Sequence, residues 1–134
     1  MYYRDENSFD FIPSNNTDIF LLAGYLHIGI DSETMTAQQV WGLHPYECWI
    51  KKTLDVPNFI LGELMVEGDI VPGMTYRIEG CENWTTEFDS ETGWVCIGES
   101  KKIINDLFIK FADDTIAVIN NGKLKALWLK PIIK

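Results

Sequence analysis

The amino-acid sequence predicts a mainly β protein: an antiparallel β-sandwich or partly open barrel with a C-terminal three-stranded meander and one short helix. The chain has short runs rich in β-branched and aromatic residues, turn signals separate them at sandwich spacing, and an Asn-Gly pair divides the last run. With 134 residues, 46% of them hydrophobic, the chain can fill a core of its own. No linker-like stretch interrupts it, so we expect a single globular domain over residues 1–134.

Short apolar runs before residue 100 are expected to form strands. Turns that contain Gly or Pro, at 56–58, 67–69 and 72–73, separate several of these runs. The tetrapeptide Asp-Ser-Glu-Thr begins at Asp31 and again at Asp89, and each copy is expected to form an acidic turn. The runs span residues 18–30, 46–54, 59–66, 74–82 and 93–97.

One helix of about two turns is expected within residues 35–45. Thr36 and Gln39 have the spacing of a capping box, in which two side chains satisfy free backbone N–H groups at the start of a helix. Gly42 and Pro45 then supply the signals that end a helix.

The strongest local signal lies in the C-terminal third. Residues 115–130 contain two β-rich runs around Asn121-Gly122, the pair favoured at the two positive-φ positions of a type I′ hairpin turn. This turn is expected to pair Ile119 with Leu124, Ala117 with Ala126 and Thr115 with Trp128.

A third strand of the meander is expected within residues 103–112, which alternate between apolar and polar positions. Asp113-Asp114 supplies the turn from this strand into the hairpin. Both faces of the meander are largely apolar, so we expect a second sheet, a helix or a partner to cover the face that does not belong to the main core.

The charge is uneven along the chain, which has a net charge of -9. Residues 1–100 hold 17 acids and four basic residues, whereas residues 101–134 hold three acids and seven lysines. A nucleic-acid binder normally shows a basic stripe and a net positive charge, because neutralising phosphates supplies most of its affinity. The composition therefore argues against nucleic acid and anionic membranes, and favours a basic partner.

The N-terminal residues include charged side chains and lack the apolar core of a secretory signal, so a cytoplasmic protein is expected. The longest strongly apolar stretch, residues 19–26, is far shorter than the roughly 20 residues of a membrane-spanning helix. Cys48, Cys81 and Cys96 form an odd set without a Cys-x-x-Cys pair, and this favours reduced thiols.

Any histidine-based chemistry has two candidates, His27 and His44. His27 lies inside an apolar run and is expected to be a partly buried imidazole with its hydrogen bonds satisfied. His44 is expected at the end of the short helix. Together with the three cysteines it resembles no zinc module, and no nucleophile or nucleotide-binding signature is present. We therefore expect no metal, no cofactor and no catalytic activity.

The segment 79–94, EGCENWTTEFDSETGW, is the most unusual part of the chain because it combines five acids with three aromatic residues and no basic group. Aromatic side chains among carboxylates are typical of a binding hot spot for a basic protein. The alternative is an acidic hairpin whose Trp84 and Phe88 reach the core. The expected partner-binding residues are Glu79, Glu82, Trp84, Glu87, Asp89 and Glu91.

These observations favour a small, acidic, cytosolic protein-binding domain that occludes a basic partner, as immunity or antitoxin-type inhibitors do with nucleases or other toxins. Self-association is compatible with this interpretation. The alternative is a small-molecule-binding barrel, or an enzyme whose site is assembled from distant residues. An enclosed pocket lined by tryptophan and approached by His27 or His44 would favour that alternative.

Overall fold

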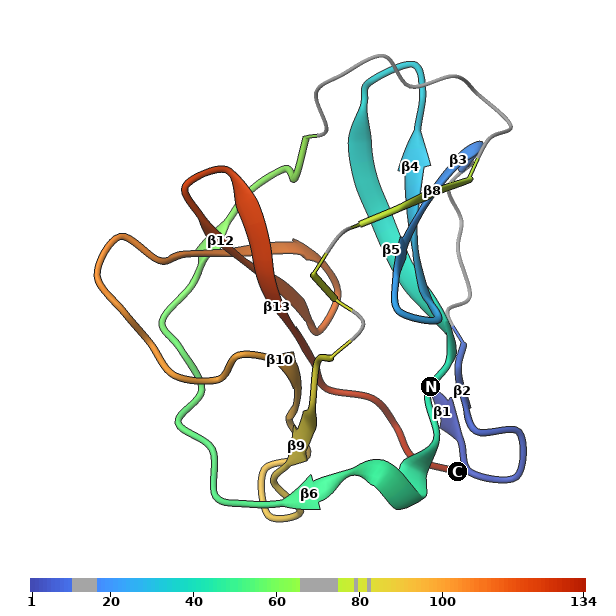
Figure 1. The fold of residues 1–134 in the computed structure, drawn as a ribbon, viewed down its shortest axis with the longest axis vertical. Coiled ribbons are helices and arrows are strands. Elements are labelled where there is room, and N and C mark those ends of the chain that lie inside the picture. The colour runs from blue at the N-terminus through green and yellow to red at the C-terminus, as the bar shows by residue number, and fades with distance from the viewer. Residues whose placement is uncertain (11–16, 66–74, 79, 82) are drawn as a thin grey trace.

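The computed structural model describes residues 1–10, 17–65, 75–78, 80–81 and 83–134 of the chain. Two β-sheets pack face to face (Figure 1). One continuous core of apolar side chains from both sheets lies between them. The prediction of a mainly β, sandwich-like fold is confirmed. Fully buried side chains such as Ile28 of one sheet and Leu127 of the other mark this core.

The first sheet has six strands in the order β1-β2-β5-β4-β3-β8. Its strands β3 and β4 form a hairpin within the run that was expected to be strand, and the first Asp-Ser-Glu-Thr turn joins β4 to β5. The bounds are β1 (Tyr2–Tyr3), β2 (Ser8–Phe9), β3 (Ile19–Ala23), β4 (Leu26–Asp31), β5 (Thr36–Leu43) and β8 (Thr75–Arg77).

The second sheet has seven strands in the order β6-β9-β10-β13-β12-β11-β7, and its β11-β12-β13 part is the predicted meander. Most neighbours are antiparallel, but three edge pairs, β3 with β8, β6 with β9 and β11 with β7, are parallel and were not expected. The bounds are β6 (Ile50–Lys51), β7 (Ile60–Leu61), β9 (Thr86–Phe88), β10 (Val95–Gly98), β11 (Leu107–Ala112), β12 (Thr115–Asn120) and β13 (Lys123–Leu129).

The helix predicted within residues 35–45 is wrong, because Thr36–Leu43 form the long strand β5. Met35 has a φ of 57° and ends the preceding turn, so the chain enters β5 in an extended conformation. Pairing with β4 then places Val40 opposite Ile28 and buries both in the core, which outweighs the local capping signals. In the described part of the chain, the helical element is the single 3-10 turn η1 (Tyr46–Cys48).

The C-terminal hairpin forms as predicted at its turn, where Asn121 and Gly122 both have positive φ. Ile119 pairs with Leu124 as expected, but the next pair is Val118 with Ala126. The expected pairs of Ala117 with Ala126 and Thr115 with Trp128 are therefore wrong by one residue. A β-bulge at Lys125 causes the shift, and it moves Trp128 to the opposite face from the one expected.

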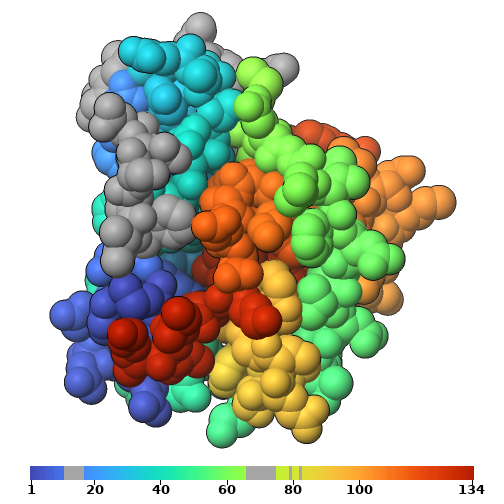
Figure 2. Space-filling view, turned by 180° about the vertical axis from the view of Figure 1, so that it is seen from behind, coloured from blue at the N-terminus to red at the C-terminus, as the bar shows by residue number. Residues whose placement is uncertain are grey.

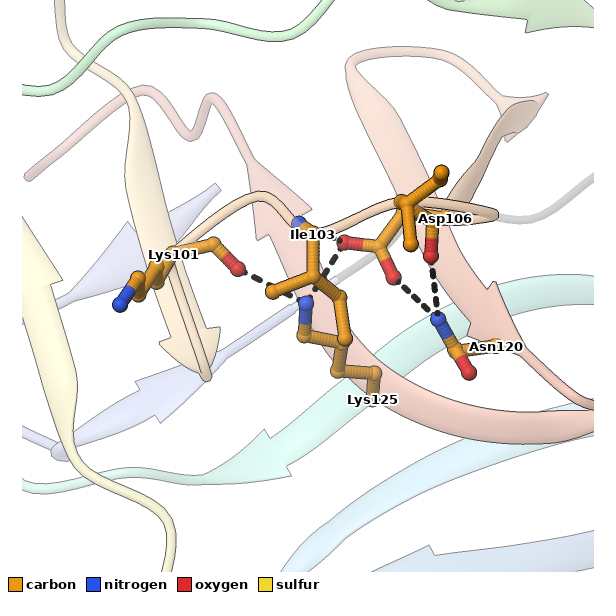
Figure 3. A network of polar contacts seen from close by, with 6 residues as sticks. Lys101, Ile103, Asp106, Asn120 and Lys125 are labelled. Carbon is orange, nitrogen blue, oxygen red and sulfur yellow. Dashed lines mark hydrogen bonds and ion pairs between the residues drawn. The ribbon is translucent and has the colours of Figure 1, made fainter.

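The bulge residue Lys125 is held by a buried polar network (Figure 3). Its Nζ lies 2.6 Å from Oδ2 of Asp106 and donates to the carbonyl of Lys101, while Asn120 donates to Oδ1 of Asp106. Gly98 faces the bulge, and a Cβ there would come within 2.6 Å of the Lys125 carbonyl oxygen. The network and this glycine fix the register of the hairpin.

Residues 52–59, which we call the strap, cross the outer face of the seven-stranded sheet from β6 at one edge to β7 at the other (Figure 1). Leu54 and Val56 of the strap pack on Ile116, Val118 and Trp128 in a second hydrophobic cluster. This face is covered, but by an irregular segment of the same chain and not by the second sheet, helix or partner that was expected.

The C-terminal residues close the β1 edge of the six-stranded sheet, so the two termini lie close together (Figure 1). The backbone N–H of Tyr2 donates to the carbonyl of Ile132 at 2.8 Å, and that of Lys134 donates to the carbonyl of Tyr2 at 2.7 Å. This edge is thus occupied by backbone of the same chain.

A candidate protein-binding edge

The acidic segment does not form one surface among the described residues. Glu79 and Glu82, two of its six expected contact residues, lie outside the described residues. Trp84 is half-buried and packs against the main core, as Phe88 does, while Glu91 is exposed in the turn between β9 and β10. Contact of this segment with a partner stays a prediction.

Asp89 is buried and holds the strap in place. Its Oδ2 accepts the backbone N–H of Leu54 at 3.0 Å, and its Oδ1 accepts those of Glu91 at 2.9 Å and Thr92 at 3.3 Å. The hydrogen bond from Leu54, followed by those from the turn, keeps the pKa of Asp89 below its usual value although burial opposes this. The Asp89 carboxylate therefore has a structural role: it holds the strap and the turn between β9 and β10 in place.

Glu87 is also engaged within the chain. Its Oε2 lies 3.0 Å from Nζ of Lys52, and its Oε1 accepts a hydrogen bond from the Ser100 hydroxyl at 2.6 Å. Burial alone would raise the pKa of Glu87, but the hydrogen bonds from Ser100 and Lys52 and the charge of Lys52 lower it. The negative charge of Glu87 is thus paired before any partner arrives.

The two histidines occupy separate environments. The His27 ring stacks on Trp41 with centroids 4.1 Å apart, and its buried Nδ1 has no hydrogen-bond partner, so the expectation of a fully satisfied imidazole is wrong. His44 follows β5 rather than a helix, and its Nε2 shares a hydrogen bond with the Thr86 hydroxyl. Burial lowers the pKa of both rings, that of His44 to about 4.

The three cysteines form no disulfide bond. Cys48 is exposed, whereas Cys81 and Cys96 are buried, and burial raises the pKa of Cys96 to about 12. A thiol with such a pKa is a poor nucleophile at neutral pH. Across the described residues, no three His, Cys, Asp or Glu side chains gather in a way that could hold a metal ion.

Two hollows lie at the surface of the described residues. One, of about 280 Å³, lies between the sheets and has Asp10, Asp113 and Asp114 in its wall. The other, of about 460 Å³, lies beside the strap with Lys102 in its wall and Trp128 at its base. Neither hollow is lined by a histidine, so the residues expected for a distant catalytic site do not meet there.

Exposed apolar side chains gather where β7 and β11 form one end of the seven-stranded sheet. The strap ends at Phe59 and leads into β7, which pairs with β11, and the loop before β11 exposes further apolar residues and is tied to β12 through Asn120. We call this set the apolar edge. It consists of Phe59, Ile60, Leu61, Ile103, Ile104 and Leu107, which are six of the eleven exposed large hydrophobic residues among those described.

Strand β7 exposes apolar side chains on both of its faces. Successive strand residues point to opposite faces of a sheet, yet Ile60 is 63% exposed and its neighbour Leu61 is 76% exposed. The strand pairs with β11 through Ile109 and Lys110, and in the described residues no further strand lies on its other side. Figure 2 shows this green segment at the surface, with orange residues on either side.

The other sheet edges are built differently: in β6 the exposed Ile50 is followed by the charged Lys51, and the remaining two edges are covered or polar. The C-terminal backbone covers β1, whereas β8 presents the polar side chains of Thr75 and Arg77 to solvent. Polar side chains and covering segments are common ways to keep an edge strand from pairing with other chains. In the described residues, β7 combines an open edge with two consecutive exposed apolar residues.

Sequence reasoning did not identify this edge. A run such as Phe59-Ile60-Leu61 before a glycine is typical of a short strand buried on both faces. No local signal distinguishes that case from an open edge, because exposure depends on which segments pack beside the strand. The run of Lys101-Lys102 directly before Ile103-Ile104 is the one local hint of a surface location.

Comparisons with protein-family models, curated proteins and solved structures found no match to this chain. Within the described residues, no helix has the length and apolar character needed to cross a membrane.

Proposed function

We propose that the protein is a protein-binding domain and that its partner binds the apolar edge. The observation that supports this is the exposure of Ile60 and Leu61, consecutive residues of an open edge strand. Large contiguous apolar patches are rare on monomeric proteins and mark interaction surfaces. Full burial of one such side chain contributes about 1.5–3 kcal/mol, so several together can offset the entropy lost on association.

The neighbouring segments support the same proposal. Ile104 is held next to β12, because Asn120 Nδ2 donates to its carbonyl and to Asp106. The loop is thus tied to β13 by the Lys125–Asp106 pair and to β12 by Asn120 (Figure 3). Interfaces that are organised before binding lose less conformational entropy when the partner arrives.

The narrower function, inhibition of a basic toxin or nuclease, stays a prediction. It would use acidic residues outside the apolar edge. Its support is the excess of acids over basic residues within residues 1–100. Glu87 and Asp89 are engaged inside the chain, so a basic partner would rely on exposed acids such as Glu91. The alternative of an enzyme has no comparable observation in its favour.

Affinity capture with matched variants tests the proposed function. The tagged protein, its Leu61→Lys variant and its Ile132→Lys variant are incubated with lysate of the host, and the retained proteins are identified by mass spectrometry. Ile132 is a suitable control because it is 68% exposed and lies near the C-terminus, away from β7.

We expect a protein that is retained by the native chain and by Ile132→Lys, and lost with Leu61→Lys. A charged residue at position 61 must be desolvated when a partner covers it, so binding should weaken at least tenfold. Equal retention by Leu61→Lys, with all three proteins shown to be folded by circular dichroism, would show that the partner does not use this edge.

A further inference from the structure

We infer that the hollow beside the strap is a binding site for a small organic phosphate. This inference goes beyond the proposed function, because none of the residues that line the hollow belongs to the apolar edge. The lining residues come from the start of the strap, from the loop between β10 and β11, and from β13. They are Lys52, Thr53, Leu54, Asp55, Ser100, Lys101, Lys102 and Trp128.

The hollow has the size of a small-molecule site. Its volume of about 460 Å³ lies within the range of about 300–1,000 Å³ that is usual for ligand pockets. A water molecule takes up about 30 Å³ in the liquid, so the hollow is larger than a phosphate group alone requires. Leu54 and Trp128 line it and are buried in the second hydrophobic cluster, so its inner part is apolar. The hollow therefore has room for an organic group attached to the phosphate.

The wall of the hollow is basic although the chain as a whole is acidic. Three of the 11 lysine and arginine residues of the chain line it, namely Lys52, Lys101 and Lys102. Asp55 is the one acid among the described lining residues. Lys52 is paired with Glu87, whereas Lys101 and Lys102 form no ion pair with any described residue. Two cationic side chains therefore remain for a negatively charged ligand.

The types of side chain in the wall favour phosphate over carboxylate. A phosphate monoester carries about -1.5 to -2 charges at pH 7, which matches the two unpaired ammonium groups, whereas a carboxylate carries one. Lysine binds phosphate as a compact point charge, and the Thr53 hydroxyl adds a neutral donor. Arginine, whose planar guanidinium suits two parallel hydrogen bonds to a carboxylate, is absent from the described lining.

Both walls of the hollow are held in place by contacts with buried groups. On the strap side, the N–H of Leu54 donates to the buried carboxylate of Asp89. On the other side, the carbonyl of Lys101 accepts a hydrogen bond of 2.7 Å from Nζ of Lys125 (Figure 3). A site that is organised before binding loses less conformational entropy when the ligand arrives.

Titration of the purified full-length chain with phenyl phosphate, followed by NMR of the backbone amides, tests the inference. Inorganic phosphate and benzoate are the comparison probes, because each keeps one part of phenyl phosphate and all three are used at the same physiological ionic strength. The test variant combines Lys101→Gln with Lys102→Gln. The matched control combines Lys123→Gln with Lys134→Gln, since both of these lysines are exposed and neither lines the hollow.

We expect phenyl phosphate to shift the amides of residues 52–55 and 100–102, and to bind more tightly than either comparison probe. The variant at Lys101 and Lys102 should bind it about tenfold more weakly, because two charged donors are lost, and the matched control should bind it as the native chain does. Asp55→Asn should strengthen binding, because it removes a negative charge from the wall.

Three results would overturn the inference. Millimolar phenyl phosphate that leaves these amides unshifted would show that the hollow is not a site. An equal loss in the two double variants, with both shown to be folded by circular dichroism, would show that the anion follows the overall charge of the protein. Benzoate that binds as tightly as phenyl phosphate would show that the hollow does not select phosphate.

Discussion

The two Asp-Ser-Glu-Thr turns have the same sequence but differ in how they are tied to the rest of the molecule. In the first turn Asp31 is half-buried and accepts the nearby N–H of Glu33 at 3.0 Å. The distant contact is made by Ser32, whose N–H and hydroxyl both donate to the carboxylate of Asp18. In the second turn Asp89 itself is buried and accepts the N–H of Leu54, 35 residues away.

This difference shows that the tetrapeptide determines the local turn and little more. Asp and Ser favour turns because their side chains bond nearby backbone groups, and both copies do so. Whether the aspartate also supports a distant segment depends on what packs against it. At Asp89 that segment is the strap, which covers the outer face of the sheet and leads to the apolar edge.

The largest effect on stability is expected at Asp106, a third carboxylate that holds a loop in place. Asp106 differs from the other two because it is paired with the buried ammonium group of Lys125 (Figure 3). Asp106→Ala should lower the free energy of unfolding by about 3 kcal/mol, because it leaves the Lys125 ammonium buried without its partner. Urea unfolding at neutral pH measures this loss. The double variant Asp106→Ala with Lys125→Met is the control and should recover part of it.

An equal loss in the single and double variants would contradict this explanation, since the cost would then come from lost packing and not from an unpaired charge.

The hydrogen bonds to Asp106 also make the stability of the protein depend on pH. Burial alone would raise the pKa of Asp106, but the donors from Ile103, Lys125 and Asn120 lower it overall. The stability it provides is therefore present above its unfolded pKa, and is lost as the pH falls through the lower folded value.

A smaller effect is expected at Asp89, and it tests the comparison of the two turns directly. Asp89→Ala should lower the melting temperature by on the order of 10 °C, because three backbone N–H groups lose their acceptor and the strap loses its anchor. Asp31→Ala is the matched control. It should lower the melting temperature by only a few degrees, because only one backbone N–H loses its acceptor. Thermal unfolding followed by circular dichroism measures both.

Equal melting temperatures for Asp89→Ala and Asp31→Ala would show that the strap does not depend on Asp89. If the strap does depend on it, Asp89→Ala should also weaken partner binding at the apolar edge, because the strap leads directly to Phe59 and β7.

Local chemistry was enough to predict several parts of the fold. The Asn121-Gly122 turn, the Asp113-Asp114 turn and both acidic turns follow from side chains that favour particular backbone conformations. The meander and the sandwich-like class follow from the alternation and spacing of apolar residues. Each of these signals is contained within a few consecutive residues.

The missed features depend on contacts with other segments of the chain. The capping signals around Thr36 failed because β4 offered a strand partner, and the hairpin register failed because Lys125 is drawn to Asp106, 19 residues away. The acidic segment was interpreted as a surface, but Lys52 and Leu54 of another segment engage two of its acids. The apolar edge was missed for the same reason, since exposure is a property of the assembled sheet.

The smallest predicted effect concerns the histidines near the two turns. His27 lies in β4, which leads to Asp31, whereas His44 contacts Thr86 of β9, which leads to Asp89. Burial lowers the pKa of His44 from 6.5 to about 4, so the unfolded chain gains a proton at this residue before the folded chain does. Stability is therefore highest above pH 6.5 and falls as the pH decreases toward 4.

Lowering the pH from 6.5 to 5.5 should reduce the free energy of unfolding by about 1 kcal/mol through His44. His44→Gln keeps a polar group that can bond Thr86 but does not titrate, so its unfolding free energy should change much less over this range. His27→Gln is the comparison: its ring stacks on Trp41 in the six-stranded sheet, so this variant should leave the contribution of His44 unchanged. If His27→Gln removed the dependence and His44→Gln did not, the first turn and not the second would be the acid-sensitive region.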